Sequence, residues 1–250
     1  MRPKNYQDNF FDFHLQDSIN SAKEIIPLVL EYIKPASVID VGCGVGTWLS
    51  IWEKHGVNDI LGIDGSYVYP ELLIEKDRFI IADLEEGFKI NRQFELVSCL
   101  EVAEHIRQRN AENFITSICN IGDIILFSAA IPGQEGTLHY NEQYPNYWIE
   151  LFAKHNFTAY DCIRPQVWAN AKISWWYRQN IMFFIRDNAK EKYPLIIKAQ
   201  HSVLSMVHPE LFKYKSMMVT DYEKILRNPF SALRYFAGSY LNKIKKLLKR

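Results

Sequence analysis

The chain has 250 residues, with 29 Lys and Arg against 29 Asp and Glu, so its formal net charge is zero. Hydrophobic residues make up 48% and charged residues 23%, which is typical of a soluble globular protein that buries a core. A neutral chain has no bulk attraction for nucleic acid, so nucleic acid is not the expected partner. The length suits one α/β domain with a small appendage.

Targeting and membrane-spanning signals do not stand out. Residues 1–13 are polar and aromatic, without the apolar run that a signal peptide has. No segment approaches the roughly 18 consecutive apolar residues of a membrane span. The four cysteines have no CxxC spacing, which argues against a zinc cluster or a disulfide framework. We therefore expect a cytoplasmic protein.

Apolar runs bounded by Pro, Gly and polar residues alternate with helical patterns along most of the chain. The patterns predict helices over 18–33, 45–55, 110–120 and 146–155. They predict strands over 37–41, 59–63, 79–81, 94–100, 123–128, 157–162 and 181–185. Strands that alternate with helices form right-handed βαβ units. We therefore predict an α/β fold: a Rossmann-like, seven-stranded, mostly parallel sheet with helices on both faces over 1–186, followed by a helical extension over 187–250.

The C-terminal extension ends in a basic stretch. Residues 227–250 hold seven Lys and Arg and no acidic residue, so the rest of the chain carries a net charge of −7 (0 minus +7). Apolar residues recur there at helical spacing: Leu233, Ala237, Leu241, Ile244 and Leu248. A basic amphipathic helix suits an anionic membrane surface, and residues 230–250 are a candidate for peripheral contact with the inner membrane surface. A helix docked on the domain or on a second subunit shows the same pattern, and the oligomeric state is open.

The strongest motif follows the first predicted strand. Asp40 lies in that strand, and Gly42, Gly44 and Gly46 separate it from the next helix. Glycines permit a tight turn and let a ligand approach the backbone at the carboxyl end of a strand. A purely structural strand–turn–helix junction has the same glycine pattern.

Two acidic residues follow the next two strands. Asp64 ends the second strand, 24 residues after Asp40, where a carboxylate can accept hydrogen bonds from ribose hydroxyls. Asp83 follows the third strand and suits the edge of an adenine ring. The NAD fingerprint requires Gly or Ala at position 47, which is Thr, and no Gly-Lys-Ser/Thr of a P-loop is present. The three features in register therefore indicate another nucleoside-containing cofactor.

The Asp-x-Gly-x-Gly-x-Gly spacing resembles motif I of the class I S-adenosylmethionine-dependent methyltransferases, and the resemblance covers roughly residues 35–186. It implies S-adenosylmethionine as cofactor, held by Asp40, Gly42, Gly44, Gly46, Asp64, Gly65, Asp83, Leu84 and Leu100. Further stretches resemble a bacterial subgroup associated with glycan or small-molecule modification: 42–49, 62–65, 100–105, 128–134, 141–145 and 175–180. The resemblance implies methyl transfer to an oxygen of a saccharide (polysaccharide-precursor) or small-molecule acceptor.

A second motif, Glu101-x-x-Glu104-His105, follows the fourth strand, where this fold binds its acceptor. The run resembles one in ubiquinone-pathway O-methyltransferases and small-RNA 2′-O-methyltransferases. It implies that Glu101, Glu104 and His105 help to hold Mg²⁺, which orients and acidifies the acceptor hydroxyl. His139 is a candidate fourth ligand. The same residues occur in methyltransferases without a metal, where Glu104 and His105 cap the following helix or bond to nearby backbone.

Proton transfer has its own candidates, because a hydroxyl acceptor loses a proton as the methyl group moves. His139, Glu142 and His105 are the candidate catalytic residues, since a positioned His is the commonest general base. His139 and Glu142 can equally fix the loop over 133–147 through hydrogen bonds.

An aromatic set follows strands five and six: Tyr140, Tyr144, Tyr147, Trp148, Trp168, Trp175, Trp176 and Tyr177. Aromatic faces suit a sugar ring or a flat substrate. We expect only two or three of them to touch substrate, and we expect Trp148 and Trp175 to be core residues.

Two rival functions fit the same motifs. The first is an RNA 2′-O-methyltransferase, suggested by the Glu-x-x-Glu-His run and the basic tail, although the net charge of −7 elsewhere is not the basic footprint of an RNA-binding protein. The second is a non-catalytic S-adenosylmethionine-binding subunit that supports a partner. The joint presence of Glu101, Glu104, His105 and His139 favours an enzyme.

Overall fold

The computed structural model describes residues 8–200 and 205–227 and the single positions 230, 233 and 237. Contacts divide the chain into two compact units, Met1–Met206 and Val207–Arg250, and the second contains α8 (Pro209–Arg227). The first unit extends past residue 186, the predicted end of the domain. The reason is that η6 (Asp187–Lys192) and α7 (Pro194–Lys198) bury Ala189 and Ile196.

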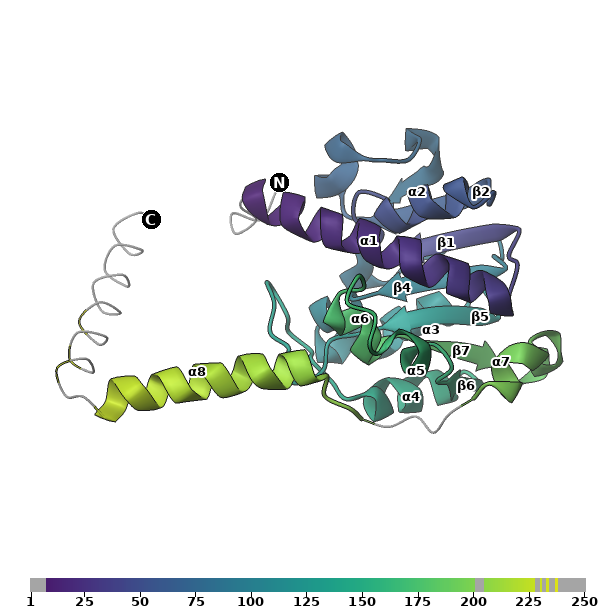
Figure 1. The fold of residues 1–250 in the computed structure, drawn as a ribbon. Helices are drawn as coiled ribbons and strands as arrows, with labels where there is room; N and C mark the ends of the chain where they lie inside the picture. The colour runs from purple at the N-terminus through teal and green to yellow at the C-terminus, as the bar shows by residue number, and fades with distance from the viewer. Residues whose placement is uncertain (1–7, 201–204, 228–229, 231–232, 234–236, 238–250) are drawn as a thin grey trace. The chain divides into compact units, whose positions relative to one another are not determined.

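The first unit is built on one seven-stranded sheet, with the order β3-β2-β1-β4-β5-β7-β6 (Figure 1). Its strands are β1 (Ser37–Val41), β2 (Asp59–Asp64), β3 (Phe79–Ile81), β4 (Leu96–Leu100), β5 (Ile124–Ser128), β6 (Phe157–Tyr160) and β7 (Met182–Arg186). The first five strands are parallel, and β7 is antiparallel to both β5 and β6. The predicted Rossmann-like, mostly parallel sheet is confirmed. The strand order reverses at β1, and ligands bind at such a point in open α/β sheets.

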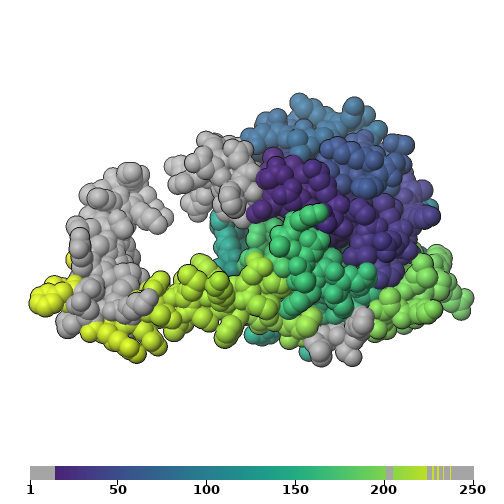
Figure 2. Space-filling view, in the orientation of Figure 1, coloured from purple at the N-terminus to yellow at the C-terminus, as the bar shows by residue number. Residues whose placement is uncertain are grey.

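Helices cover both faces of the sheet. One face carries α1 (Asp8–Tyr32), α2 (Thr47–Lys54), α5 (Arg164–Val167) and α6 (Trp175–Asn180), and the other carries α3 (Ala111–Cys119) and α4 (Pro145–Ala153). The first helix begins at Asp8, earlier than the predicted start at residue 18, and continues through Pro27. Figure 2 shows α1, in purple, beside the green segment that contains α5 and α6.

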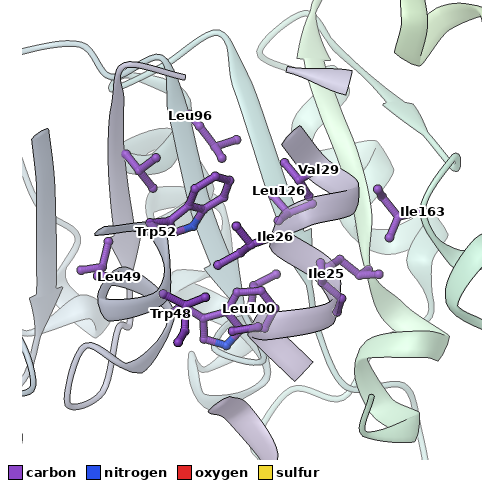
Figure 3. Packing of buried hydrophobic residues seen from close by; sticks show 14 of the residues in the cluster. Ile25, Ile26, Val29, Trp48, Leu49, Trp52, Leu96, Leu100, Leu126 and Ile163 are labelled. Atoms are coloured by element: carbon purple, nitrogen blue, oxygen red, sulfur yellow. The ribbon is translucent and has the colours of Figure 1, made fainter. Parts of the chain in front are cut away.

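The packing under α1 and α2 positions the start of the site. Ile25, Ile26 and Val29 of α1 are fully buried in the same apolar cluster as Trp48 and Trp52 of α2 (Figure 3). Because α2 begins directly after the glycine loop, this packing holds the loop against the end of the sheet. The first helix therefore matters to the site as well as to the core.

The connections after β2 and β3, both within the described residues, contain no α-helix. They contain only 3₁₀ turns: η1 (Ser66–Glu71), η2 (Lys76–Arg78) and η3 (Leu84–Glu86). After β4 come η4 (Ala103–His105) and η5 (Gln108–Asn110), which lead into α3.

The C-terminal unit is described mainly through α8. The basic helix predicted over 230–250 lies outside the described residues except for positions 230, 233 and 237, so its membrane contact stays a prediction. Within the described part of the chain, none of the helices combines the length and the apolarity needed to cross a membrane.

Candidate active site

The glycine loop between β1 and α2 has the backbone that its sequence predicts. Gly42, Gly44 and Gly46 have φ angles of 77°, 55° and 85°, in the left-handed region that favours glycine. The N–H of Gly42 donates to the carbonyl oxygen of Ile63 at 2.8 Å, which joins the loop to the end of β2. A Cβ atom at position 42 would lie 2.4 Å from Cγ2 of Val102, so only glycine fits there.

Gly42→Ala should therefore destabilise the protein by roughly 2 kcal/mol or more, because it combines a positive φ with overpacking. Gly56→Ala is the matched control, since Gly56 has φ 88° but nothing within 4 Å of its Cβ position. We expect the control to lower the melting temperature much less than Gly42→Ala in thermal unfolding. Equal losses would show that the contact with Val102 does not matter.

Asp64 joins the glycine loop to β2. Its buried carboxylate accepts hydrogen bonds from the N–H of Gly44 at 2.7 Å, the N–H of Gly65 at 2.6 Å and the hydroxyl of Tyr67 at 2.8 Å. Burial raises the pKa of the Asp64 carboxyl above its usual value, and the three donors oppose that shift. The residue is placed at the strand end as predicted.

Asp83 and Leu84 lie farther along the same edge. Asp83 is exposed, and its carboxylate accepts the N–H of Glu85 at 3.0 Å, so in this structure it caps η3. Leu84 is half-buried against the apolar cluster that the sheet forms with α3 and α4. Their contacts with adenine stay a prediction.

A cavity of about 570 Å³ opens at the carboxyl ends of β1, β4 and β5. Four of the predicted cofactor residues line this cavity: Asp40, Gly42, Gly44 and Leu100. The other five do not line it: Gly46, Asp64, Gly65, Asp83 and Leu84. Burial raises the pKa of Asp40 to about 7. The cavity is also lined by Glu101, Glu104, His105 and His139, so both predicted motifs meet in one space.

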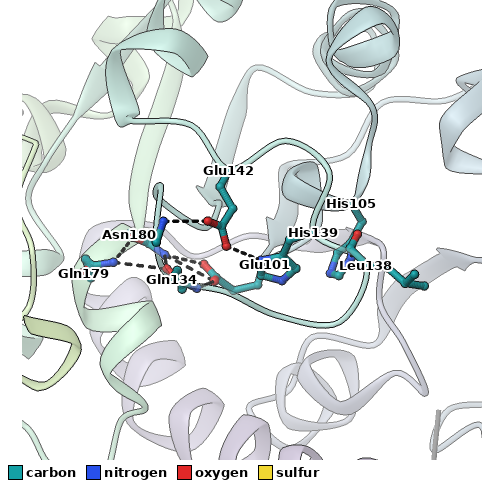
Figure 4. A network of polar contacts seen from close by, with 9 residues as sticks. Glu101, His105, Gln134, Leu138, His139, Glu142, Gln179 and Asn180 are labelled. Carbon is teal, nitrogen blue, oxygen red and sulfur yellow. Dashed lines mark hydrogen bonds and ion pairs between the residues drawn. The ribbon is translucent and has the colours of Figure 1, made fainter. Parts of the chain in front are cut away.

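His139 and Glu142 form a pair at this cavity (Figure 4). The Nδ1–H of His139 donates to Oε1 of Glu142 at 2.9 Å, and Oε2 of Glu142 accepts the N–H of Gly133 at 2.8 Å. Glu142 therefore both orients the imidazole and fixes the loop after β5. The arrangement leaves Nε2 of His139 as the nitrogen that can accept a proton.

Glu104, His105 and His139 form a compact group. One ligand atom from each lies within 4.8 Å of the others, and the two rings meet edge to face at 4.8 Å. Glu104 is buried, and its Oε2 has no hydrogen-bond partner among the described residues. The Nδ1–H of His105 donates to the carbonyl oxygen of Leu138 at 3.2 Å, and burial lowers the pKa of His105 to about 4. Such a carboxylate and two imidazoles can hold a metal ion.

Glu101 is placed differently from the predicted metal set. It does not belong to the compact group, because its carboxylate is turned toward side-chain amides. Gln134 donates to Oε2 at 2.7 Å and Asn180 donates to Oε1 at 3.1 Å (Figure 4). His139, the predicted fourth ligand, does belong to the group.

The aromatic set divides between core and cavity. Trp148 is buried on α4, as predicted. The prediction that Trp175 is a core residue is wrong: it is half-buried and lines the cavity, because α6 begins with it at the cavity wall. Trp175, Trp176 and Tyr177 are the members of the set that line the cavity, and their contact with substrate stays a prediction.

Several cavity residues are absent from the predicted site. Leu15 and Ser18 of α1 line the cavity, and the hydroxyl of Ser18 lies 3.4 Å from that of Tyr177. Trp48 on α2 lines it too and meets Tyr177 edge to face at 5.2 Å. The run of amide side chains before β7 was the one local signal for the contacts with Glu101.

Comparisons with known proteins agree with this geometry. A family model described as a methyltransferase domain matches residues 19–161. No curated protein sequence matches the chain.

Solved structures show the same fold. The chain is similar to magnesium protoporphyrin IX methyltransferase from Synechocystis PCC 6803 with bound S-adenosylhomocysteine, at 15% identity and TM-score 0.50, over 73% of this chain and 90% of that one. It is also similar to a protein provisionally named an O-methyltransferase from Nostoc punctiforme PCC 73102, at 16% identity and TM-score 0.51, over 67% of this chain and 56% of that one.

Proposed function

The chain belongs to the class I S-adenosylmethionine-dependent methyltransferases, and we propose that it methylates an oxygen of a saccharide or small-molecule acceptor. The observation that carries the choice of oxygen is the pair of His139 and Glu142 at the cavity that the glycine loop also lines. A hydroxyl acceptor needs a base of this kind, and an oriented imidazole supplies one.

The strand-end residues define the proposed cofactor site. Asp40, Gly42 and Gly44 line the part of the cavity next to β1 and suit the methionine portion of the cofactor. Asp64 suits the ribose hydroxyls, which would take the place of the Tyr67 hydroxyl on its carboxylate. Gly65, Asp83, Leu84 and Leu100 complete the proposed adenosine side.

The residues near the acceptor would position the hydroxyl and remove its proton. The methyl group of a sulfonium is already activated, so the protein mainly holds donor and acceptor in line. Nε2 of His139 takes the hydroxyl proton as the new bond forms. Glu142 stabilises the imidazolium that results, because its Oε1 accepts the Nδ1–H at 2.9 Å.

A metal ion fits the same cavity. The unpartnered Oε2 of Glu104 next to two imidazoles is an observation that a bound cation would explain. Bound there, a divalent cation would lower the pKa of an acceptor hydroxyl. Because Nε2 of His139 would then be one of its ligands, the cation would replace that nitrogen as the group that activates the hydroxyl. Two imidazoles suit Mn²⁺, Fe²⁺ or Zn²⁺ better than the Mg²⁺ expected from the sequence, because Mg²⁺ prefers oxygen ligands.

Removal of metal ions therefore tests the metal proposal. We expect dialysis against EDTA to lower methyl transfer at least about tenfold, because the cation that lowers the pKa of the acceptor hydroxyl is removed. Added Mn²⁺ should restore the rate better than added Mg²⁺. Full activity in EDTA would exclude a catalytic metal ion and leave Nε2 of His139 as the base.

The acceptor class is tested directly with labelled cofactor. The protein is incubated with S-adenosylmethionine labelled in its methyl group and with a bacterial extract divided into small molecules, saccharides and RNA. The proposal is supported if the label appears in the saccharide or small-molecule fraction and resists treatment with base, as a methyl ether does. Label confined to RNA would establish the rival 2′-O-methyltransferase. No transfer to any fraction would favour a supporting subunit without activity.

A further inference from the structure

Glu101 is held in an unusual conformation at the cavity wall. It is the first residue after β4, and its φ of 56° lies in the left-handed region that a glutamate seldom adopts. Its N–H donates to the carbonyl oxygen of Ser128 at 3.0 Å and to the Ser128 hydroxyl at 3.1 Å. Non-glycine residues keep such a backbone only where the surroundings enforce it, often at functional sites.

Three side-chain amides orient the carboxylate of Glu101, and we call Gln134, Gln179 and Asn180 the amide clamp. Gln134 donates to Oε2 at 2.7 Å and Asn180 donates to Oε1 at 3.1 Å. Asn180 and Gln179 also donate to Oε1 of Gln134, at 3.0 and 3.3 Å. The donors are neutral, so the amide clamp orients the carboxylate without cancelling its charge. A carboxylate has about four lone-pair positions, so it can accept further donors from a ligand.

The helix that supplies Asn180 also supplies indole rings to the cavity. Trp175 and Trp176 open α6 and line the cavity, with their rings 5.5 Å apart and edge to face. Indole faces attract cations, and a desolvated carboxylate binds a cation more strongly than an exposed one. The wall formed by Glu101 and α6 thus presents the two kinds of group that bind an ammonium ion.

We propose that Glu101 binds a primary ammonium group in this cavity. Two molecules can bring one: the cofactor, through the ammonium of its methionine portion, or an acceptor that carries an amine, such as an amino sugar. The inference rests on the proposed function, since both ligands enter through it. It assigns Glu101 to ligand recognition and leaves metal binding to Glu104, His105 and His139.

Glu101→Gln tests the proposal, because it keeps the size of the side chain and removes its charge. In the first arm, calorimetry compares S-adenosylhomocysteine with 5′-methylthioadenosine, which lacks the ammonium and carboxylate groups. If the cofactor is the source, the variant binds S-adenosylhomocysteine about tenfold or more weakly, which is typical for loss of a charge-assisted hydrogen bond, and binds 5′-methylthioadenosine as before.

The second arm examines the acceptor. Protein saturated with S-adenosylhomocysteine is titrated with methyl glucosaminide and with its N-acetylated form, and tryptophan fluorescence reports binding because Trp175 and Trp176 line the cavity. If the acceptor is the source, the native protein prefers the ammonium form by about tenfold and the variant loses that preference. A variant that matches the native protein in both arms overturns the proposal.

Two further variants keep the result interpretable. Glu150→Gln removes an exposed carboxylate of α4 that does not line the cavity, and we expect it to bind every probe as the native protein does. Asn180→Ala removes one hydrogen bond that orients Glu101 and keeps the charge of Glu101. It should weaken binding of the same ammonium ligand, but less than Glu101→Gln does. If Glu101→Gln does not fold, this variant tests the proposal in its place. Native protein that binds no S-adenosylhomocysteine would contradict the proposed function instead.

Discussion

Asp64→Ala should weaken S-adenosylhomocysteine binding by about 100-fold or more, the largest effect that we expect from one side chain on the cofactor. The carboxylate has two tasks. It accepts the N–H of Gly44 and so holds the glycine loop, and in the proposed complex it accepts the ribose hydroxyls. Each hydrogen bond to a charged group contributes roughly 1.5–3 kcal/mol, so the loss of two or more gives this factor.

The measurement is calorimetric titration of the folded variant. Asp64→Asn is the informative companion, because one oxygen remains to accept from Gly44 while the charge is lost, and its affinity should fall between those of the other two proteins. Asp83→Ala should cost far less, since Asp83 is exposed and caps only a 3₁₀ turn. Native affinity in Asp64→Ala would place the ribose elsewhere.

His139→Ala should lower kcat by about 10²–10⁴-fold, the range for loss of a positioned general base. The affinity for S-adenosylhomocysteine should change little, because the proposed cofactor contacts lie at the glycine loop and Asp64, whereas His139 pairs with Glu142 in the loop after β5. Single-turnover experiments with the fraction that accepts the labelled methyl group measure the rate of methyl transfer. Calorimetry with S-adenosylhomocysteine measures the affinity for the cofactor product.

His155→Ala is the control for His139→Ala. Its Nε2 lies 3.1 Å from the hydroxyl of Thr116, and it has no place on the cavity wall, so methyl transfer should be unchanged. Glu142→Gln should lower kcat less than His139→Ala, since it keeps a hydrogen-bond acceptor for Nδ1 but removes the charge. Equal losses of kcat and cofactor affinity in His139→Ala would show that His139 supports structure and is not the base.

The fold and the residues at the carboxyl ends of β1 and β2 were predictable because their sequence signals are local. A buried run that ends in three glycines requires a strand and a tight turn, and parallel strands place their carboxyl ends at one edge. Asp40, Gly42, Gly44 and Asp64 could therefore be placed from spacing alone, and the structure puts them where the pattern did.

The acceptor side was less predictable because its contacts are long-range. Asn180 reaches Glu101 across 79 positions, and Ser18 reaches Tyr177 across 159. No periodicity reports such contacts. Glu101 has a left-handed backbone and its carboxylate bonds to the amide clamp, so it lies outside the compact group that Glu104 and His105 form with His139, the predicted fourth ligand.

Trp175 shows a second limit. An indole before a core strand is normally buried, and composition cannot distinguish that position from a cavity wall. The short helix α6 decides it, because it places Trp175 at the wall and buries Tyr177, Gln179 and Asn180. The stability of such a short helix comes from tertiary packing and not from its own sequence.

The central claim is that the edge formed by β1, β2 and β4 binds S-adenosylmethionine for methyl transfer. Calorimetric titration of the full-length protein with S-adenosylhomocysteine tests it most directly. The account predicts one site per chain with about micromolar affinity, and loss of that site in Asp64→Ala. No binding by the folded native protein, with or without Mn²⁺ or Mg²⁺, would contradict it.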